Sequence, residues 1–233
     1  MKTVKEAIDS FAHIFFPHLC VGCGSDLIGD EQLLCLQCIN KLPSTNFELY
    51  ASNPVEKIFW GRASIKSASA QYYFTKNSIL QHILHQLKYK GKKEIGIYFG
   101  RMMGEALCQS NRFADINALV PLPLFASKER RRGYNQANVL AEGISSVTKL
   151  PILDNCIERI TATETQTQKN RIERWQNISG KFKLKDKEMI RGKHILLIDD
   201  VITTGATLDA CANELLQAEE VQVSVAALAY ALA

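Results

Sequence analysis

ILLIDDVITTGAT, residues 195 to 207, places an apolar run before two adjacent aspartates, Asp199 and Asp200, and follows them with a threonine-rich turn around Gly205. The apolar run is typical of a buried strand, and the residues from Thr207 onward have the pattern of a helix. In a parallel sheet, ligands bind in the loops at the carboxyl ends of the strands. The stretch therefore predicts a strand, a binding loop and a helix in succession.

Strand and helix patterns alternate over most of the remaining chain. Strands are expected at 63–75, 116–124, 151–160, 194–199 and 221–230. Helices are expected at 78–89, 94–109 and 135–150, and from residue 207 onward. Such alternation indicates a mostly parallel sheet with helices on both faces.

The chain has 233 residues and is 46% hydrophobic, which is enough for a sizeable core. Its apolar stretches are much shorter than the roughly 20 residues that cross a bilayer. Asp9 and His13 interrupt an N-terminal run that otherwise imitates a signal peptide. We therefore expect a cytoplasmic protein without membrane insertion.

Two CxxC pairs lie near the N-terminus, CVGC at 20–23 and CLQC at 35–38, separated by 11 residues. Each pair can turn two sulfurs toward one ion, and two pairs complete a tetrahedral zinc site that is closed to substrate. Disulfides and a thioredoxin-like redox motif are weaker alternatives. The sequence predicts a structural zinc ion bound by Cys20, Cys23, Cys35 and Cys38. The remaining cysteines, Cys108, Cys156 and Cys211, are expected in the core.

Charge and composition divide the chain near residue 60. Residues 1–60 carry 4 basic and 7 acidic residues, whereas residues 61–233 carry 24 and 17. Residues 41–59 contain two prolines and no sustained periodicity, which is typical of a linker. We expect a zinc-ribbon module and linker over residues 1–60, and a second domain with a separate core over residues 61–233. The basic excess suits a phosphorylated small molecule as well as nucleic acid.

The turn after the two aspartates can bind a phosphate group. Backbone N–H groups can converge on one anion there, helped by the helix N-terminus and by threonine hydroxyls. Asp199 and Asp200 precede the turn, so their carboxylates can accept hydrogen bonds from the vicinal hydroxyls of a sugar whose phosphate occupies it. The predicted ligand is a ribose 5-phosphate. The expected phosphate-binding residues are Thr203, Thr204, Gly205, Ala206 and Thr207.

ILLIDDVITTGAT resembles the phosphoribosyl pyrophosphate (PRPP) signature of the type I phosphoribosyltransferases. Together with the two CxxC pairs, three further stretches resemble the ComF family, and these are LKYKGKKE at 87–94, PLPLFASKERRRGYNQ at 121–136 and TQTQKNRIERWQN at 165–177. The resemblance implies an α/β protein with the type I phosphoribosyltransferase fold, a mostly parallel sheet flanked by helices, and a small N-terminal zinc-ribbon module.

The same resemblance implies roles for two polar stretches. Arg130, Arg131 and Arg132 lie in a loop that contacts pyrophosphate, which guanidinium groups bind well, and Gly133 allows the backbone to approach a phosphate. A solvated basic turn is the alternative. Residues 165–177 correspond to a mobile loop over the active site, and the side chains that could reach the ligand from it are Arg171, Arg174 and Asn177.

Three functions fit the resemblance. The first is Mg²⁺-dependent transfer of phosphoribosyl from PRPP to an unidentified nitrogen acceptor, with Asp199, Asp200 and Arg132 as catalytic residues. The second is an accessory protein that handles single-stranded DNA with the DNA-uptake machinery in natural transformation, PRPP being a ligand or regulator. The third is a PRPP sensor without turnover. Whether the chain is an enzyme therefore stays open.

A basic stretch with interleaved aromatic residues could bind single-stranded DNA apart from the PRPP cleft. Its residues are Lys88, Lys90, Lys92, Lys93, Tyr89 and Tyr98. A solvated helix end is an equally good interpretation.

Overall fold

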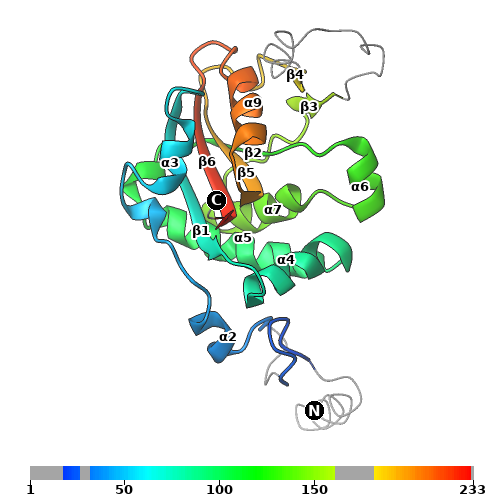
Figure 1. The fold of residues 1–233 in the computed structure, drawn as a ribbon. Helices are drawn as coiled ribbons and strands as arrows, with labels where there is room; N and C mark the ends of the chain where they lie inside the picture. Colours follow the sequence, from blue (N-terminus) through cyan, green and yellow to red (C-terminus); the bar gives the residue numbers. More distant parts are fainter. Residues whose placement is uncertain (1–17, 27–31, 161–180, 232–233) are drawn as a thin grey trace, which may run out of the picture.

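The computed structural model describes residues 18–26, 32–160 and 181–231, in which a four-stranded parallel sheet organises the larger part of the chain (Figure 1). The strand order is β1 (Ile65–Phe74), β6 (Gln222–Ala231), β5 (His194–Ile202) and β2 (Ala118–Pro121). All three neighbouring pairs are parallel. A separate antiparallel pair joins β3 (Ile157–Arg159) to β4 (Phe182–Leu184). The predicted mostly parallel sheet is confirmed.

Helices cover both faces of the sheet because side chains along each strand alternate between them. On β5, Leu196 and Ile198 point into one buried cluster, and Ile195 and Leu197 point into the other. The first cluster is covered by α4 (Ile79–Tyr89), α5 (Lys93–Cys108) and α7 (Gln136–Thr148). The second is covered by α3 (Pro54–Phe59) and α9 (Ala206–Leu215). Shorter elements are α2 (Leu36–Asn40), η1 (Phe47–Leu49), η2 (Asn111–Phe113) and α6 (Ala126–Arg132).

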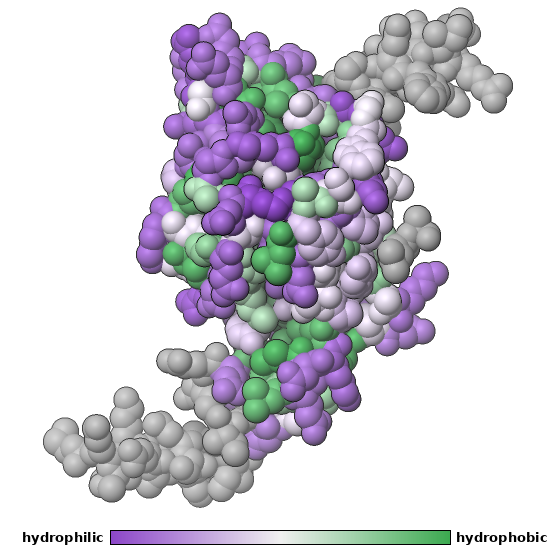
Figure 2. Space-filling model, turned by 90° about the vertical axis from the view of Figure 1, so that its left-hand side faces the viewer, coloured by the Kyte–Doolittle hydropathy of each residue, from purple (hydrophilic) through white to green (hydrophobic). Residues whose placement is uncertain are grey.

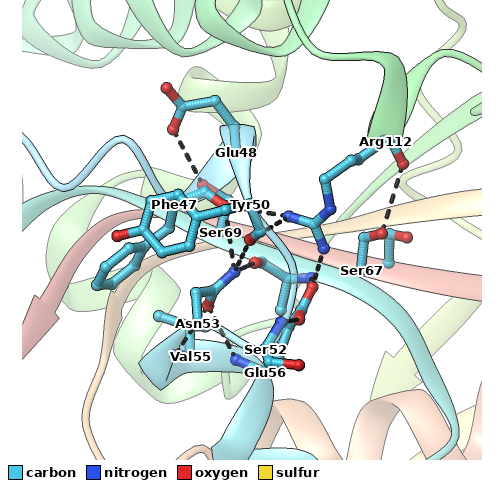
Figure 3. Close-up of polar contacts among 12 residues, drawn as sticks. Phe47, Glu48, Tyr50, Ser52, Asn53, Val55, Glu56, Ser67, Ser69 and Arg112 are labelled. Atoms are coloured by element: carbon cyan, nitrogen blue, oxygen red, sulfur yellow. Dashed lines mark hydrogen bonds and ion pairs between the residues drawn. The ribbon is translucent and has the colours of Figure 1, made fainter.

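Residues 47–59 pack against the sheet, so the expectation of a linker at 41–59 is wrong for this part. Phe47, Val55 and Phe59 are each at most 2% exposed and belong to the second buried cluster. The segment has no periodic apolar stripe in its sequence, and a polar side chain, Asn53, holds it in place through hydrogen bonds to the backbone. The Asn53 side chain donates to the carbonyls of Phe47, Tyr50 and Ala68 and accepts from the first turn of α3 (Figure 3).

An arginine from η2 closes the same network. Arg112 forms an ion pair with Glu56 and donates to the carbonyls of Phe47 and Tyr50 at 3.1 and 2.8 Å (Figure 3). A guanidinium group can hold several acceptors at once because its donors are arranged in a rigid plane. The network fixes α3 against β1 and, as described below, next to the predicted phosphate loop.

The cysteine module, the described part of residues 18–40 that holds the two CxxC pairs, lies against α4 at one end of the molecule (Figure 1). Cys20, Val21, Leu34 and Cys38 belong to the same buried cluster as the apolar face of α4, so the expectation of a separate core is wrong. Gln86 of α4 donates to the Val21 carbonyl at 2.7 Å. Figure 2 shows apolar side chains on the surface of this module, where Leu36 is 74% exposed.

Two further sequence expectations concern cysteines and membrane segments. Cys156 and Cys211 are buried as predicted, but Cys108 is exposed because it ends α5. Within the described ranges, no helix combines the length and the apolar character required of a membrane span.

Candidate functional site

The two adjacent aspartates lie near the carboxyl end of β5, where the sequence predicts them. Successive strand residues point to opposite faces, so Asp200 lies on the α4 side of the sheet, and Asp199 lies on the side of α9 and β3. The Asp200 N–H donates to Asp199 Oδ1 at 2.8 Å. The pair therefore presents two carboxyl groups at the end of one strand.

Burial and, to a lesser degree, the neighbouring charge of Asp200 together raise the pKa of the Asp199 carboxyl to about 8. Lys88 and Arg159 oppose this rise because both are cations. A carboxyl group with so high a pKa is mostly protonated at neutral pH, and it becomes a charged acceptor when a cation or a hydrogen-bond donor arrives. Two close carboxylates with unequal surroundings are typical of binding and catalytic sites.

Lys88 at the end of α4 contacts this pair, which sequence reasoning missed. Its Nζ lies 3.0 Å from Asp200 Oδ2, and the two side chains are only 23% and 13% exposed. The expectation that all four lysines of residues 88–93 form a surface apart from the cleft is therefore wrong for Lys88. Lys92 also contacts a buried side chain, because its Nζ donates to Gln86 Oε1 at 2.8 Å.

The threonine-rich turn follows directly after β5. Asp199 and the residues from Val201 to Leu208 line a small pocket of about 50 Å³. Thr203 and Thr204 are exposed, and α9 begins at Ala206 after Gly205, whose φ is +70°. The helix N-terminus thus opens onto the pocket, an arrangement that favours an anion. The five predicted phosphate-binding residues, Thr203, Thr204, Gly205, Ala206 and Thr207, lie together here.

Residues outside the motif hold this turn in place. A Cβ added at Gly205 would overlap Ile58 Cγ2 of α3. Arg62 Nη1 donates to the Thr204 carbonyl at 3.1 Å, and the Ala63 N–H donates to Asp209 Oδ1 at 2.9 Å. The segment that follows the cysteine module therefore supports the predicted phosphate loop.

The three consecutive arginines lie in the last turn of α6, so the expected loop begins only at Gly133. Arg130 and Arg131 are exposed, and Gly133 ends the helix with a φ of +81°. Arg132 is partly buried, donates to Gln136 Oε1 at 2.5 Å and lies with its guanidinium 5.6 Å from the centre of the Tyr89 ring.

The arginine segment packs against the basic end of α4. Tyr134 donates its hydroxyl to the Leu87 carbonyl, and Lys93 lies 5.3 Å from the Tyr134 ring centre. Among the described residues, the buried Nε of Arg132 has no hydrogen-bond partner, which leaves a donor available to an anion. The stretches 87–94 and 130–136, separate in sequence, thus form one basic face.

Arg159 at the end of β3 is a second residue that sequence reasoning missed. Its guanidinium lies 3.9 Å from the Phe125 ring centre and 5.3 Å from that of Phe182. Burial lowers its pKa, and the negative charge of Asp199 raises it. Its placement depends on tertiary packing, and residues 151–160 carry no motif that would have revealed it. The predicted lid at 165–177, with Arg171, Arg174 and Asn177, lies outside the described residues.

The four cysteines of the CxxC pairs come together as predicted. Their sulfurs all lie within 4.8 Å of one another, and Cys23 Sγ is 3.7 Å from Cys35 Sγ. Four sulfurs at about 2.3 Å from a tetrahedral zinc ion would be about 3.8 Å apart, so the cluster fits that ion. The Cys35 N–H donates to Cys20 Sγ at 3.3 Å, the kind of bond that orients a thiolate ligand.

The sequence is similar to that of several known proteins. Residues 130–233 match the family model of the phosphoribosyl transferase domain. The chain is 28% identical to Competence protein F of Haemophilus influenzae over 223 residues, which are 90% of this chain and 96% of that protein. It is 27% identical to DNA utilization protein YhgH of Salmonella typhi over 202 residues, covering 85% of this chain and 78% of that protein. It is 33% identical to Competence protein ComFC of Bacillus subtilis over 145 residues, which are 62% of this chain and 56% of that protein.

Proposed function

We propose that the chain binds PRPP with Mg²⁺ and transfers the phosphoribosyl group to a nitrogen acceptor. The match of residues 130–233 to the phosphoribosyl transferase domain and the similarity to competence protein F and YhgH support this proposal. The single observation that carries the proposal is the position of the acid pair at the end of β5, directly before the turn from Thr203 to Thr207 and the start of α9. A sugar phosphate needs these two kinds of group side by side.

Each part of the ligand has a matching group in the site. The turn and the N-terminus of α9 bind the 5-phosphate through backbone N–H groups and hydroxyls. Asp199 and Asp200 accept hydrogen bonds from the ribose hydroxyls. Arg132, with its unpartnered buried Nε, binds the diphosphate. The carboxylates also suit a hard cation such as Mg²⁺, which would be held mainly by the ligand's own oxygens.

In the proposed reaction, the bond between the anomeric carbon and the diphosphate oxygen breaks, and that oxygen keeps the electron pair. The acceptor nitrogen then forms a bond to the anomeric carbon and loses its proton to solvent or to a base on the acceptor side. The two aspartates favour the positive charge that develops on the sugar, and Arg132 favours the negative charge on the leaving group. When bound, Mg²⁺ would supply further positive charge to the diphosphate.

Calorimetry with PRPP, in the presence and absence of Mg²⁺, tests the binding step. Release of diphosphate with a panel of nitrogen bases tests turnover. We expect binding that depends on Mg²⁺ and on both aspartates. Binding without diphosphate release from any base would instead support a PRPP sensor without turnover.

The names of the relatives and the basic face support a second candidate function, the handling of single-stranded DNA. Tyr89 is 54% exposed and lies beside Arg132, so bases could stack there while nearby cations contact phosphates. Changing Lys90 and Lys93 together should weaken DNA binding and flatten its salt dependence, by about 0.7 log unit per lost phosphate contact. Lys88 and Lys92 are left unchanged in this variant because Lys88 contacts Asp200 and Lys92 contacts Gln86.

A further inference from the structure

The proposed ligand and the acid pair carry charge of the same sign. PRPP is a polyanion, and Asp199 and Asp200 place two carboxyl groups within its binding site. A binding site of this kind requires a cation close to the carboxylates, because the interaction between like charges is strong where water is partly excluded. The arginines of α6 lie on another element, and two of them, Arg130 and Arg131, are exposed to solvent.

Lys88 meets this requirement. Its ammonium is 3.0 Å from Asp200 Oδ2, and both side chains are largely buried. Lys88 is the lysine of the last turn of α4, directly before Tyr89, whose ring lies under the Arg132 guanidinium. The end of α4 thus carries both the cation that contacts Asp200 and the ring that packs against Arg132.

We propose that Lys88 is a ligand-binding residue of the phosphoribosyl site. In the free protein its ammonium neutralises Asp200. When the ligand binds, Asp200 accepts hydrogen bonds from the ribose hydroxyls and the Lys88 ammonium contacts the diphosphate oxygens. Both charged groups therefore keep a partner in the bound state. This inference rests on the proposed function and assigns a lysine that the sequence placed on a DNA-binding surface to the ligand site.

The cysteine module positions this lysine through Gln86. The Gln86 side chain is buried, donates to the Val21 carbonyl between Cys20 and Cys23, and accepts from Lys92. A Cβ added at Gly22 in the same knuckle would lie 3.1 Å from Ile79 Cγ2, so the module also touches the first turn of α4. Contacts at both ends of α4 fix the helix that carries Lys88.

The test compares Lys88→Met, Lys88→Arg and Gln86→Leu with Lys76→Met as the control. Lys76 is exposed just before α4 and has no part in the proposed site. PRPP affinity with Mg²⁺ is measured by calorimetry from pH 6.5 to 9, and urea unfolding checks the stability of each variant. We expect the PRPP affinity to fall at least tenfold in Lys88→Met and by a smaller factor in Gln86→Leu. Lys88→Arg should keep part of the affinity, and the control should change it less than twofold.

The pH profile separates a direct role from a structural one. Lys88 lowers the pKa of Asp199, so removing this cation raises that pKa, and the pH at which affinity reaches half its maximum should move upward in Lys88→Met. Loss of stability alone leaves that midpoint in place. If the wild type binds PRPP and Lys88→Met has the same affinity and midpoint, the role of Lys88 is refuted and the proposed function stands. If the wild type does not bind PRPP, both fall together.

Discussion

Replacing Gly205 by alanine tests whether α3 supports the phosphate loop. Gly205 has a φ of +70°, a conformation that costs a residue with a Cβ about 1–2 kcal/mol. The added Cβ would also overlap Ile58, and forcing an extra carbon into a packed contact costs about 1–3 kcal/mol. The two effects together predict that the free energy of unfolding falls by about 2–5 kcal/mol, a large part of the stability of a typical domain.

Gly61→Ala is the matched control for this prediction. Gly61 has a φ of +72°, but a Cβ there would have no atom within 4 Å, so only the backbone cost of about 1–2 kcal/mol applies. Both variants are compared with the wild type by urea denaturation, followed by fluorescence and circular dichroism. Equal losses in the two variants would show that Ile58 yields freely, and the argument that α3 braces the loop would then be wrong.

Three further predictions follow from buried or clustered groups. Burial lowers the pKa of His194, so the unfolded state binds the proton more readily, and stability should be complete above about pH 6.5 and fall as the pH drops below it; urea titrations should show a flatter profile in His194→Gln. Cys35→Ser should remove one ligand of the predicted zinc site and lower the melting temperature of the whole chain in one transition, because the module shares its core with α4; two separate transitions in calorimetry would contradict that packing. Because the pKa of Asp199 is raised to about 8, PRPP binding at pH 7 should release protons, detected by calorimetry in buffers of different ionisation heat, and Asp199→Asn should abolish that release.

Local patterns predicted the parts of the molecule that depend on neighbours in sequence. The strand of residues 194–199, the turn that follows it and the helix after Thr207 are encoded by consecutive residues, and the structure has β5 and α9 there. The cysteine cluster was equally predictable, because each CxxC pair fixes its own knuckle. The helical state of Arg130 to Arg132 was not predicted, because the resemblance assigned these residues to a loop, although lysine, glutamate and arginine are good helix formers.

The remaining features depend on contacts between distant segments. Residues 47–59 are held in place by hydrogen bonds from Asn53 and Arg112 to backbone carbonyls. Such contacts produce no apolar periodicity in the sequence, so the segment could not be recognised from it. Lys88 looks like any solvated lysine at a helix end until the fold brings it to Asp200. Arg159 is a similar case, because its partners Phe125 and Phe182 come from separate elements.

The binding of PRPP with Mg²⁺ to the wild type, Asp199→Asn and Asp200→Asn, measured side by side by calorimetry, tests the central claim most directly. The amide variants keep the shape of the site and remove the charged acceptors for the ribose hydroxyls. We predict that the wild type binds PRPP in the presence of Mg²⁺. In each variant the binding free energy should weaken by about 1.5–3 kcal/mol, the usual value of a hydrogen bond to a charged group. Unchanged affinity in both variants, or no binding by the wild type, would contradict the assignment of this strand end as a phosphoribosyl site.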